Sequence, residues 1–292
     1  MDLSPYMRKR ILKFQKDEIT GKILCSEIAS MMKNTNNKKV LLDISQAENL
    51  HYEQWKIFTG KDIEPNWLKI RSYKFLYLVL GETFVIKLLE QIEQVGIKEL
   101  NEIIKEIPEA KKIMAQEEEH ENKLIGLIDE EKLKYVGSMV LGLNDALVEL
   151  SGTIAGMTFA LANTKLVALA AIITGFAATL SMAASNYLAE RANRSETAVK
   201  SSIYTGMAYL ITVILLILPY LILPDSLYLA AFVIMIIMVV LIISSFNFYV
   251  SVVQSIPFWP RFTEMATITL GISALSFVIG ILAKNVLGID VG

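Results

Sequence analysis

Charge is distributed unevenly along this chain of 292 residues, and that feature constrains its fold most strongly. Residues 1–135 contain 45 charged side chains, whereas residues 136–292 contain 13. The second part contains charge-free stretches about as long as a helix needs to cross a bilayer core of roughly 30 Å. The sequence therefore predicts a water-soluble first half and a membrane-embedded second half.

The second half predicts five membrane-spanning helices in a domain at residues 132–292. Turns are expected where polar, charged or proline residues interrupt the apolar pattern, at residues 163–165, 190–200, 224–226 and 257–260. The spans are expected at about residues 136–162, 166–189, 201–224, 227–252 and 263–286.

Basic residues near the span ends predict the orientation, because cytoplasmic loops of membrane proteins are enriched in Lys and Arg. Two lie on the side of the C-terminus, Lys165 and Lys284. Six lie on the side of the N-terminal half: Lys132, Lys134, Arg191, Arg194, Lys200 and Arg261. We therefore expect an integral protein of the cell membrane or a vacuole-like membrane, with its first half in the cytoplasm and its C-terminus outside.

The first half predicts a helical bundle, because apolar residues recur at helical spacing through residues 5–131. Breaks are expected at residues 34–37 and 60–65 and at Gly96, with a short extra helix at 98–106. The four main helices are expected at about residues 6–33, 36–58, 67–95 and 109–129. Four helices of this length favour a four-helix bundle.

Charge and cysteine content exclude several classes of function. The net charge of −2 comes from mixed signs, which leaves no basic surface for nucleic acid. Cys25 is the only cysteine, so the chain has no internal disulfide, thiolate metal cluster or CxxC redox pair.

The two histidines of the chain form a candidate metal-binding pattern. His51 follows Glu48 by three residues, and His120 follows Glu117 by three. Residues i and i+3 share a face of a helix, so each pair can bind one metal ion. Two Glu-x-x-His helices with one glutamate from each of two other helices form the di-metal carboxylate site of four-helix bundles.

The other two main helices can supply these glutamates. Glu18 lies in the middle of the first helix, and Glu90 and Glu93 share a face of the third. Three alternatives remain open: Glu27 in place of Glu18, Glu82 in place of Glu90, and Glu121 as a further ligand. Carboxylate and imidazole ligands accept Fe²⁺, Mn²⁺ or Zn²⁺.

The order of these residues, Glu, Glu-x-x-His, Glu-x-x-Glu and Glu-x-x-His, resembles that of a rubrerythrin-type ferritin-like domain. The resemblance implies a ferritin-like four-helix bundle at residues 1–131 that holds two ions of Fe²⁺ or Mn²⁺. It implies seven ligands: Glu18, Glu48, His51, Glu90, Glu93, Glu117 and His120. The chain departs from classical rubrerythrin in lacking the rubredoxin cysteines, which argues against peroxide reduction by that route.

Carboxylates inside the predicted first span point to a polar path through the membrane, because ionised groups there are costly and usually functional. Asp145 and Glu149 are one helical turn apart, and Asn144 lies beside them. Met182 in the second span offers a thioether, although packing is its more common role. Glu264 opens the fifth span, where it either receives cations or caps the helix.

The membrane half resembles the vacuolar iron transporter family. The matching motifs are GLNDALVE at 142–149, SGTIAG at 151–156 and SMAASNY at 181–187. The resemblance implies a dimer that exports Fe²⁺ or Mn²⁺ from the cytosol in exchange for protons, with Asp145 and Met182 on the path. Asn186 departs from the family, which usually has an acid there, and the Glu-rich insert between spans 2 and 3 is missing. Both halves together look like membrane-bound ferritin-like proteins.

These patterns favour a divalent-metal exporter whose cytoplasmic di-metal domain collects, senses or oxidises the metal. The main alternative is a membrane-anchored di-iron oxidase that transports nothing, and a metal sensor is a third hypothesis. Small residues in the first span, Ser138 with Gly142 and Gly152 with Gly156, permit close helix approach and predict that two copies pair there.

Overall fold

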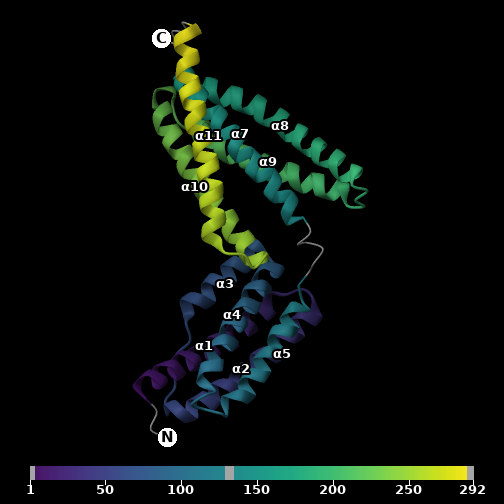
Figure 1. Ribbon diagram of the computed structural model, residues 1–292, viewed down its shortest axis with the longest axis vertical. Helices are drawn as coiled ribbons and strands as arrows, with labels where there is room; N and C mark the ends of the chain where they lie inside the picture. The colour runs from purple at the N-terminus through teal and green to yellow at the C-terminus, as the bar shows by residue number, and fades with distance from the viewer. Residues whose placement is uncertain (1–3, 129–134, 288–292) are drawn as a thin grey trace. The chain divides into compact units, whose positions relative to one another are not determined.

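The computed structural model describes residues 4–128 and 135–287, and every regular element in these ranges is helical (Figure 1). This confirms the predicted all-α class. The chain divides into two compact units, Met1–Asp129 and Glu130–Gly292. The predicted domain boundary, between residues 131 and 132, lies outside the described residues.

The N-terminal unit is built around two pairs of packed helices. The first pair is α1 (Pro5–Met31) with α2 (Thr35–Thr59), and the second is α4 (Glu82–Ile103) with α5 (Ala110–Ile125). The short α3 (Trp67–Leu80) contacts α1 and α4 (Figure 1). Apolar side chains from both pairs form one core, which includes Met7, Ile11, Trp55, Leu100 and Ile113.

The helix predicted at residues 67–95 is in fact two helices, because the chain breaks at Gly81. Gly81 has φ +85°, a backbone conformation that favours glycine over residues with a Cβ. Gly96 was expected to end a helix, but it lies inside α4, and the short helix predicted at 98–106 is largely the end of α4. Glycine identity alone did not distinguish a break from a tolerated helical position.

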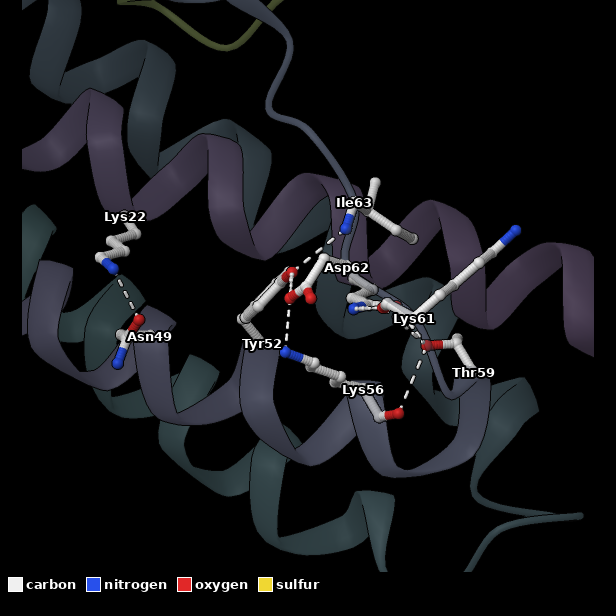
Figure 2. A network of polar contacts seen from close by, with 9 residues as sticks. Lys22, Asn49, Tyr52, Lys56, Thr59, Lys61, Asp62 and Ile63 are labelled. Atoms are coloured by element: carbon white, nitrogen blue, oxygen red, sulfur yellow. Dashed lines mark hydrogen bonds and ion pairs between the residues drawn. The ribbon is translucent and has the colours of Figure 1, made fainter.

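A network of polar contacts holds α1, α2 and the loop after α2 in a fixed register (Figure 2). The Tyr52 hydroxyl donates to Asp62 at 3.1 Å and accepts from the backbone N–H of Ile63. The Thr59 hydroxyl donates to Gln15 of α1 at 2.6 Å, and the Gln15 amide donates to the Lys61 carbonyl oxygen at 2.9 Å. Gln15 lies one turn before the candidate ligand Glu18, and Tyr52 directly follows the candidate ligand His51, so these contacts restrain the helices that carry the ligands.

Within residues 135–287, the C-terminal unit contains five long helices. They are α7 (Val136–Leu161), α8 (Thr164–Ala192), α9 (Ala198–Ile222), α10 (Tyr228–Val253) and α11 (Phe258–Leu287), with a 3₁₀ turn at Asp225–Leu227. Among the described residues, α8 to α11 are long and apolar enough to cross a membrane. The helix α7, which carries Asp145 and Glu149, is not in that group, so the count of five spans stays a prediction.

The helix α7 contacts all four of its neighbours, α8, α9, α10 and α11. Its small residues permit close approach to α11 of the same chain: a Cβ at Gly152 would lie 2.8 Å from the Ser276 hydroxyl, and one at Gly156 would lie 3.0 Å from the Ser276 carbonyl oxygen. The hydroxyls of Ser151 and Ser273 are 2.7 Å apart in the same contact. Gly152 and Gly156 therefore pack against α11 of the same chain, and the expectation that two copies pair at this face stays a prediction.

Candidate metal centre

Six of the seven predicted ligands converge inside the N-terminal unit, and they come from four helices. Glu18 lies on α1, Glu48 and His51 on α2, Glu93 on α4, and Glu117 and His120 on α5. The i, i+3 spacing directs both members of each Glu-x-x-His pair into the same space. Five of the six are buried, and Glu93 is half-buried.

These residues form two groups of potential ligands. The first is Glu18, Glu48, His51 and Glu117, and the second is Glu48, Glu93, Glu117 and His120. In each group, one ligand atom per residue lies within 4.8 Å of the others. Glu48 and Glu117 belong to both groups, so each can place a carboxylate between two neighbouring cations.

Distances within the cluster are short. Nδ1 of His51 is 2.7 Å from a carboxylate oxygen of Glu117 and 3.4 Å from one of Glu18. Nδ1 of His120 is 3.4 Å from both Glu48 and Glu117. The two imidazole rings are 5.7 Å apart between centroids. The spacing is that of a compact cluster, with one histidine in each group.

The structure places Glu90 apart from the other predicted ligands. It is buried, but it forms an ion pair with Lys87 and accepts a hydrogen bond from the Gln94 amide at 2.8 Å. Neither ligand group includes it. The rotation of α4 therefore presents Glu93, three residues further on, to the cluster.

The three alternative ligands also have partners outside the cluster. Glu27 forms an ion pair with Lys74 at 2.5 Å, and Glu82 accepts from the Asn37 amide at 2.6 Å. Glu121 accepts from the Gln94 amide at 2.9 Å. None of them belongs to either ligand group, so the geometry favours Glu18 over Glu27 and does not recruit Glu121.

Burial and mutual contact shift the pKa values of the cluster strongly. Burial, followed by repulsion from the charge of Glu117, raises the pKa of Glu48 and of Glu93 well above its usual value. Burial opposes protonation of His51, but the neighbouring carboxylates of Glu117 and Glu18 outweigh it and raise its pKa to about 11. For His120, Glu117 and Glu48 outweigh burial in the same way and raise the pKa to about 9. Protons held by these glutamates and histidines therefore reduce the repulsion between the buried carboxylates. Divalent cations can replace these protons.

The donor atoms of the cluster fit a pair of metal ions. Apart from the contacts within the cluster, at least one polar atom of Glu18, Glu48, His51, Glu117 and His120 is fully buried without a hydrogen-bond partner, which is costly unless another group satisfies it. The remaining atoms are held from outside: the Trp55 indole N–H donates to Glu18 at 3.0 Å, and Nε2 of His51 is 3.1 Å from the Gln116 side-chain oxygen. Such outer contacts fix which nitrogen of a histidine is free to bind metal, here Nδ1.

The sequence did not identify these supporting residues. Trp55 is fully buried in the core, and its indole N–H donates to Glu18. Gln116 directly precedes Glu117, but no spacing rule singles it out. Gly21 lies against the cluster, because a Cβ at this position would be 2.8 Å from a carboxylate oxygen of Glu48.

A cavity of about 430 Å³ reaches the cluster from the side of α1 and α4. Four of the candidate ligands line it, Glu18, Glu48, Glu93 and Glu117. Much of the rest is apolar, including Leu24, Cys25, Leu88, Leu89 and Ile92. The cavity therefore gives small molecules or ions access to the ligand groups.

The polar residues predicted in the membrane half do not form a comparable cluster among the described residues. Glu149 accepts a hydrogen bond from the buried Tyr209 of α9 at 3.0 Å, a partner that the sequence did not suggest. Asp145, one turn earlier on α7, and the adjacent Asn144 are half-buried. Both acids therefore lie on the part of α7 near Tyr209.

The other predicted path residues differ in their surroundings. Met182 packs against the apolar core of the membrane unit. Asn186 is buried and accepts from the Ser201 hydroxyl at 2.9 Å, and this hydroxyl is 2.7 Å from that of Ser138. Glu264 is exposed near the start of α11. A buried amide with a hydrogen-bond partner explains why a neutral residue is stable at position 186.

Comparison with known proteins gives a family match in the membrane unit. No curated protein and no solved structure matches the chain. Residues 136–197 match the model of the VIT family, and the matched segment includes Asp145, Glu149, Met182 and Asn186. Together with the four apolar helices, this match supports an integral membrane protein whose membrane unit resembles a VIT-family metal-ion transporter.

Proposed function

We propose that the chain exports Fe²⁺ or Mn²⁺ from the cytosol in exchange for protons, and that its N-terminal unit is a ferritin-like domain holding two metal ions. The observation that carries this proposal is the pair of ligand groups sharing Glu48 and Glu117, in the same chain as a VIT-like segment. The domain collects, senses or oxidises the metal, α7 to α11 form five spans, and two copies form a dimer.

The donor set supports the choice of metal. Carboxylate oxygens and imidazole nitrogens suit Fe²⁺ and Mn²⁺, and no thiolate belongs to either ligand group. Glu18 and His51 would hold one ion, Glu93 and His120 the other, with Glu48 and Glu117 between them. Bound iron would supply redox chemistry, while the protein residues would fix the separation of the two ions.

The double variant His51→Ala/His120→Ala tests the N-terminal site in the full-length protein. Each ligand group loses its only nitrogen donor, so we expect loss of tight binding of both ions. Metal analysis after dialysis measures the stoichiometry. Gln46→Ala/Glu118→Ala is the matched control, since both side chains are exposed on the same two helices. Unchanged stoichiometry in the histidine variant would refute the assignment.

In the membrane unit, we propose that Asp145 couples metal movement to proton movement. An acid in a low-dielectric environment favours its neutral form when no cation is near, and a divalent cation beside it favours the carboxylate. Metal entry therefore expels a proton, and protonation from the outer side helps to release the metal. Glu149, held by Tyr209, lies one turn further along α7 and can accept the cation next.

Asp145→Asn tests this step, because asparagine keeps the size of the side chain but cannot ionise. We expect a folded protein that binds metal in its N-terminal unit but shows little metal flux and no metal-driven proton movement in proteoliposomes. Glu196→Gln, the same chemical change at an exposed position between α8 and α9, should keep full flux. Wild-type flux in Asp145→Asn would assign the residue a structural role.

A second candidate function is a membrane-anchored oxidase, which the cavity beside Glu18 and Glu93 favours because it opens the ligand groups to a small oxidant. An oxidase of this kind needs no transport path. Sealed proteoliposomes separate the two: oxidation of external Fe²⁺ without metal accumulation inside would favour the oxidase, and accumulation that depends on Asp145 would favour the transporter.

A further inference from the structure

The helix α3 presents apolar side chains to solvent. Ile70 is its one buried residue, whereas an outward stripe along its full length is exposed. The large apolar members are exposed by 51 to 76%: Trp67, Leu68, Phe75, Leu78 and Val79. Their spacing of three, four and seven residues places them on one side of the helix. Contiguous apolar surface on one side of a helix indicates an interaction site.

The charges of α3 indicate which partner covers this stripe. The helix contains three basic residues, Lys69, Arg71 and Lys74, and no acid. Lys74 is paired with Glu27 of α1, while Arg71 lies exposed within the outward stripe. Exposed tryptophan, phenylalanine and leucine combined with basic residues are typical of helices that lie in the surface of an anionic membrane.

We propose that the outward face of α3 binds the anionic surface of the membrane that holds the apolar helices of the same chain. Trp67, Phe75 and Leu78 enter the boundary between headgroups and acyl chains, and Arg71 contacts lipid phosphate. This function is independent of metal transport and requires only that the chain is a membrane protein.

Charge and chain length both favour lipid over a second copy of α3. Two copies face to face would bring the exposed Arg71 of each stripe into one contact without any acid from either helix, which is unfavourable. Six residues separate Ile128 from Tyr135, which directly precedes α7, so the connection spans at most roughly 25 Å. Such a tether keeps the N-terminal unit close to the bilayer and raises the effective concentration of α3 at its surface.

The test uses the full-length protein with Cys25→Ala and one labelled cysteine, Phe75→Cys, in liposomes that contain brominated lipid. We expect strong quenching of a fluorophore at this position when the lipid is anionic. Lys112→Cys on α5 is the control, because this exposed position lies on a different helix and should remain unquenched. Arg71→Glu reverses one charge and should lower the ratio of bound to free α3 by roughly thirtyfold on an anionic bilayer.

Two outcomes would overturn the proposal. A fluorophore at position 75 that remains in water at every lipid composition shows that no membrane contact exists. Energy transfer between labels at position 75 in two copies, without lipid quenching, shows that another copy covers the stripe. Quenching at position 75 that falls with Arg71→Glu and is absent at position 112 supports lipid contact.

Discussion

At the scale of residues, Gly21 shows how a missing side chain makes room for a ligand. The helix α1 passes so close to Glu48 that a Cβ at position 21 would lie 2.8 Å from its carboxylate oxygen. This carboxylate belongs to both ligand groups. The absence of a side chain at Gly21 therefore sets where Glu48 lies between the two proposed ions.

Gly21→Ala should separate stability from metal binding. Alanine is favoured over glycine inside a helix by roughly 1 kcal/mol, while the displaced Glu48 should weaken metal affinity by about ten- to a hundredfold. Thermal unfolding without metal and titration calorimetry with Mn²⁺ measure the two effects.

The matched control is Gly96→Ala on α4, where a Cβ would have no neighbour within 4 Å. It should gain helix stability at unchanged metal affinity. Equal affinities in both variants would show that Glu48 does not need its present position.

Six predicted ligands lie together in the structure, and the sequence could predict this because the pairing of each histidine with a glutamate depends only on spacing within one helix. Glu48 with His51, and Glu117 with His120, need only one helical turn to share a face. Glu90 and Glu93 could not be distinguished in this way, since both lie on the same side of α4 and the packing of the whole helix decides which one enters the cluster. Gln116 and Trp55 act through contacts between helices, which no spacing within one helix predicts.

At the scale of elements, α7 and α11 make a close backbone contact in the membrane unit. A Cβ at Gly280 would lie far inside contact distance of the Gly156 carbonyl oxygen, which is backbone and cannot rotate away. The two helices can approach so closely only because both positions lack a side chain.

Gly280→Ala should therefore force α7 and α11 apart and lower stability by about 1–3 kcal/mol. Gly271→Ala lies on the same helix, has no neighbour within 4 Å of the added Cβ, and should show no such loss of stability. Thermal unfolding of both variants in the same detergent gives the comparison. If the two variants unfold alike, α11 does not pack on α7 as described.

The bounds of the helices could be predicted from the sequence where an apolar run gives way abruptly to polar residues or proline. All five helices of the C-terminal unit lie close to the predicted spans, because each turn contains polar residues or proline that end an apolar run. Breaks inside apolar or mixed segments were less predictable. Gly81 and Gly96 are the same residue type, and only the backbone conformation at Gly81 separates them. The small residues Gly152 and Gly156 predict close helix packing, but they do not predict which helix packs against them.

At the scale of the whole molecule, the division of charge predicts two parts, and the chain divides into two compact units. The same reasoning predicts which ends of the helices face the cytoplasm. Arg194 follows α8, and Asp225 lies beyond the end of α9, so one crossing separates them.

Cysteines at positions 194 and 225, each in a chain with Cys25→Ala, should react with an impermeant reagent from opposite sides. In intact cells we expect labelling at position 225, and labelling at 194 after the cells are opened. Labelling of both positions in intact cells would contradict the predicted topology.

The single buried side chain of α3, Ile70, has a consequence for cooperativity of folding. Because α3 contributes one buried side chain, its detachment costs little of the free energy of folding. Gly81 also interrupts the helix at its junction with α4. Therefore α3 can open as a local unit while α1, α2, α4 and α5 stay folded. Its amide protons would then exchange with solvent through this opening, well before those of the helices that surround the carboxylates.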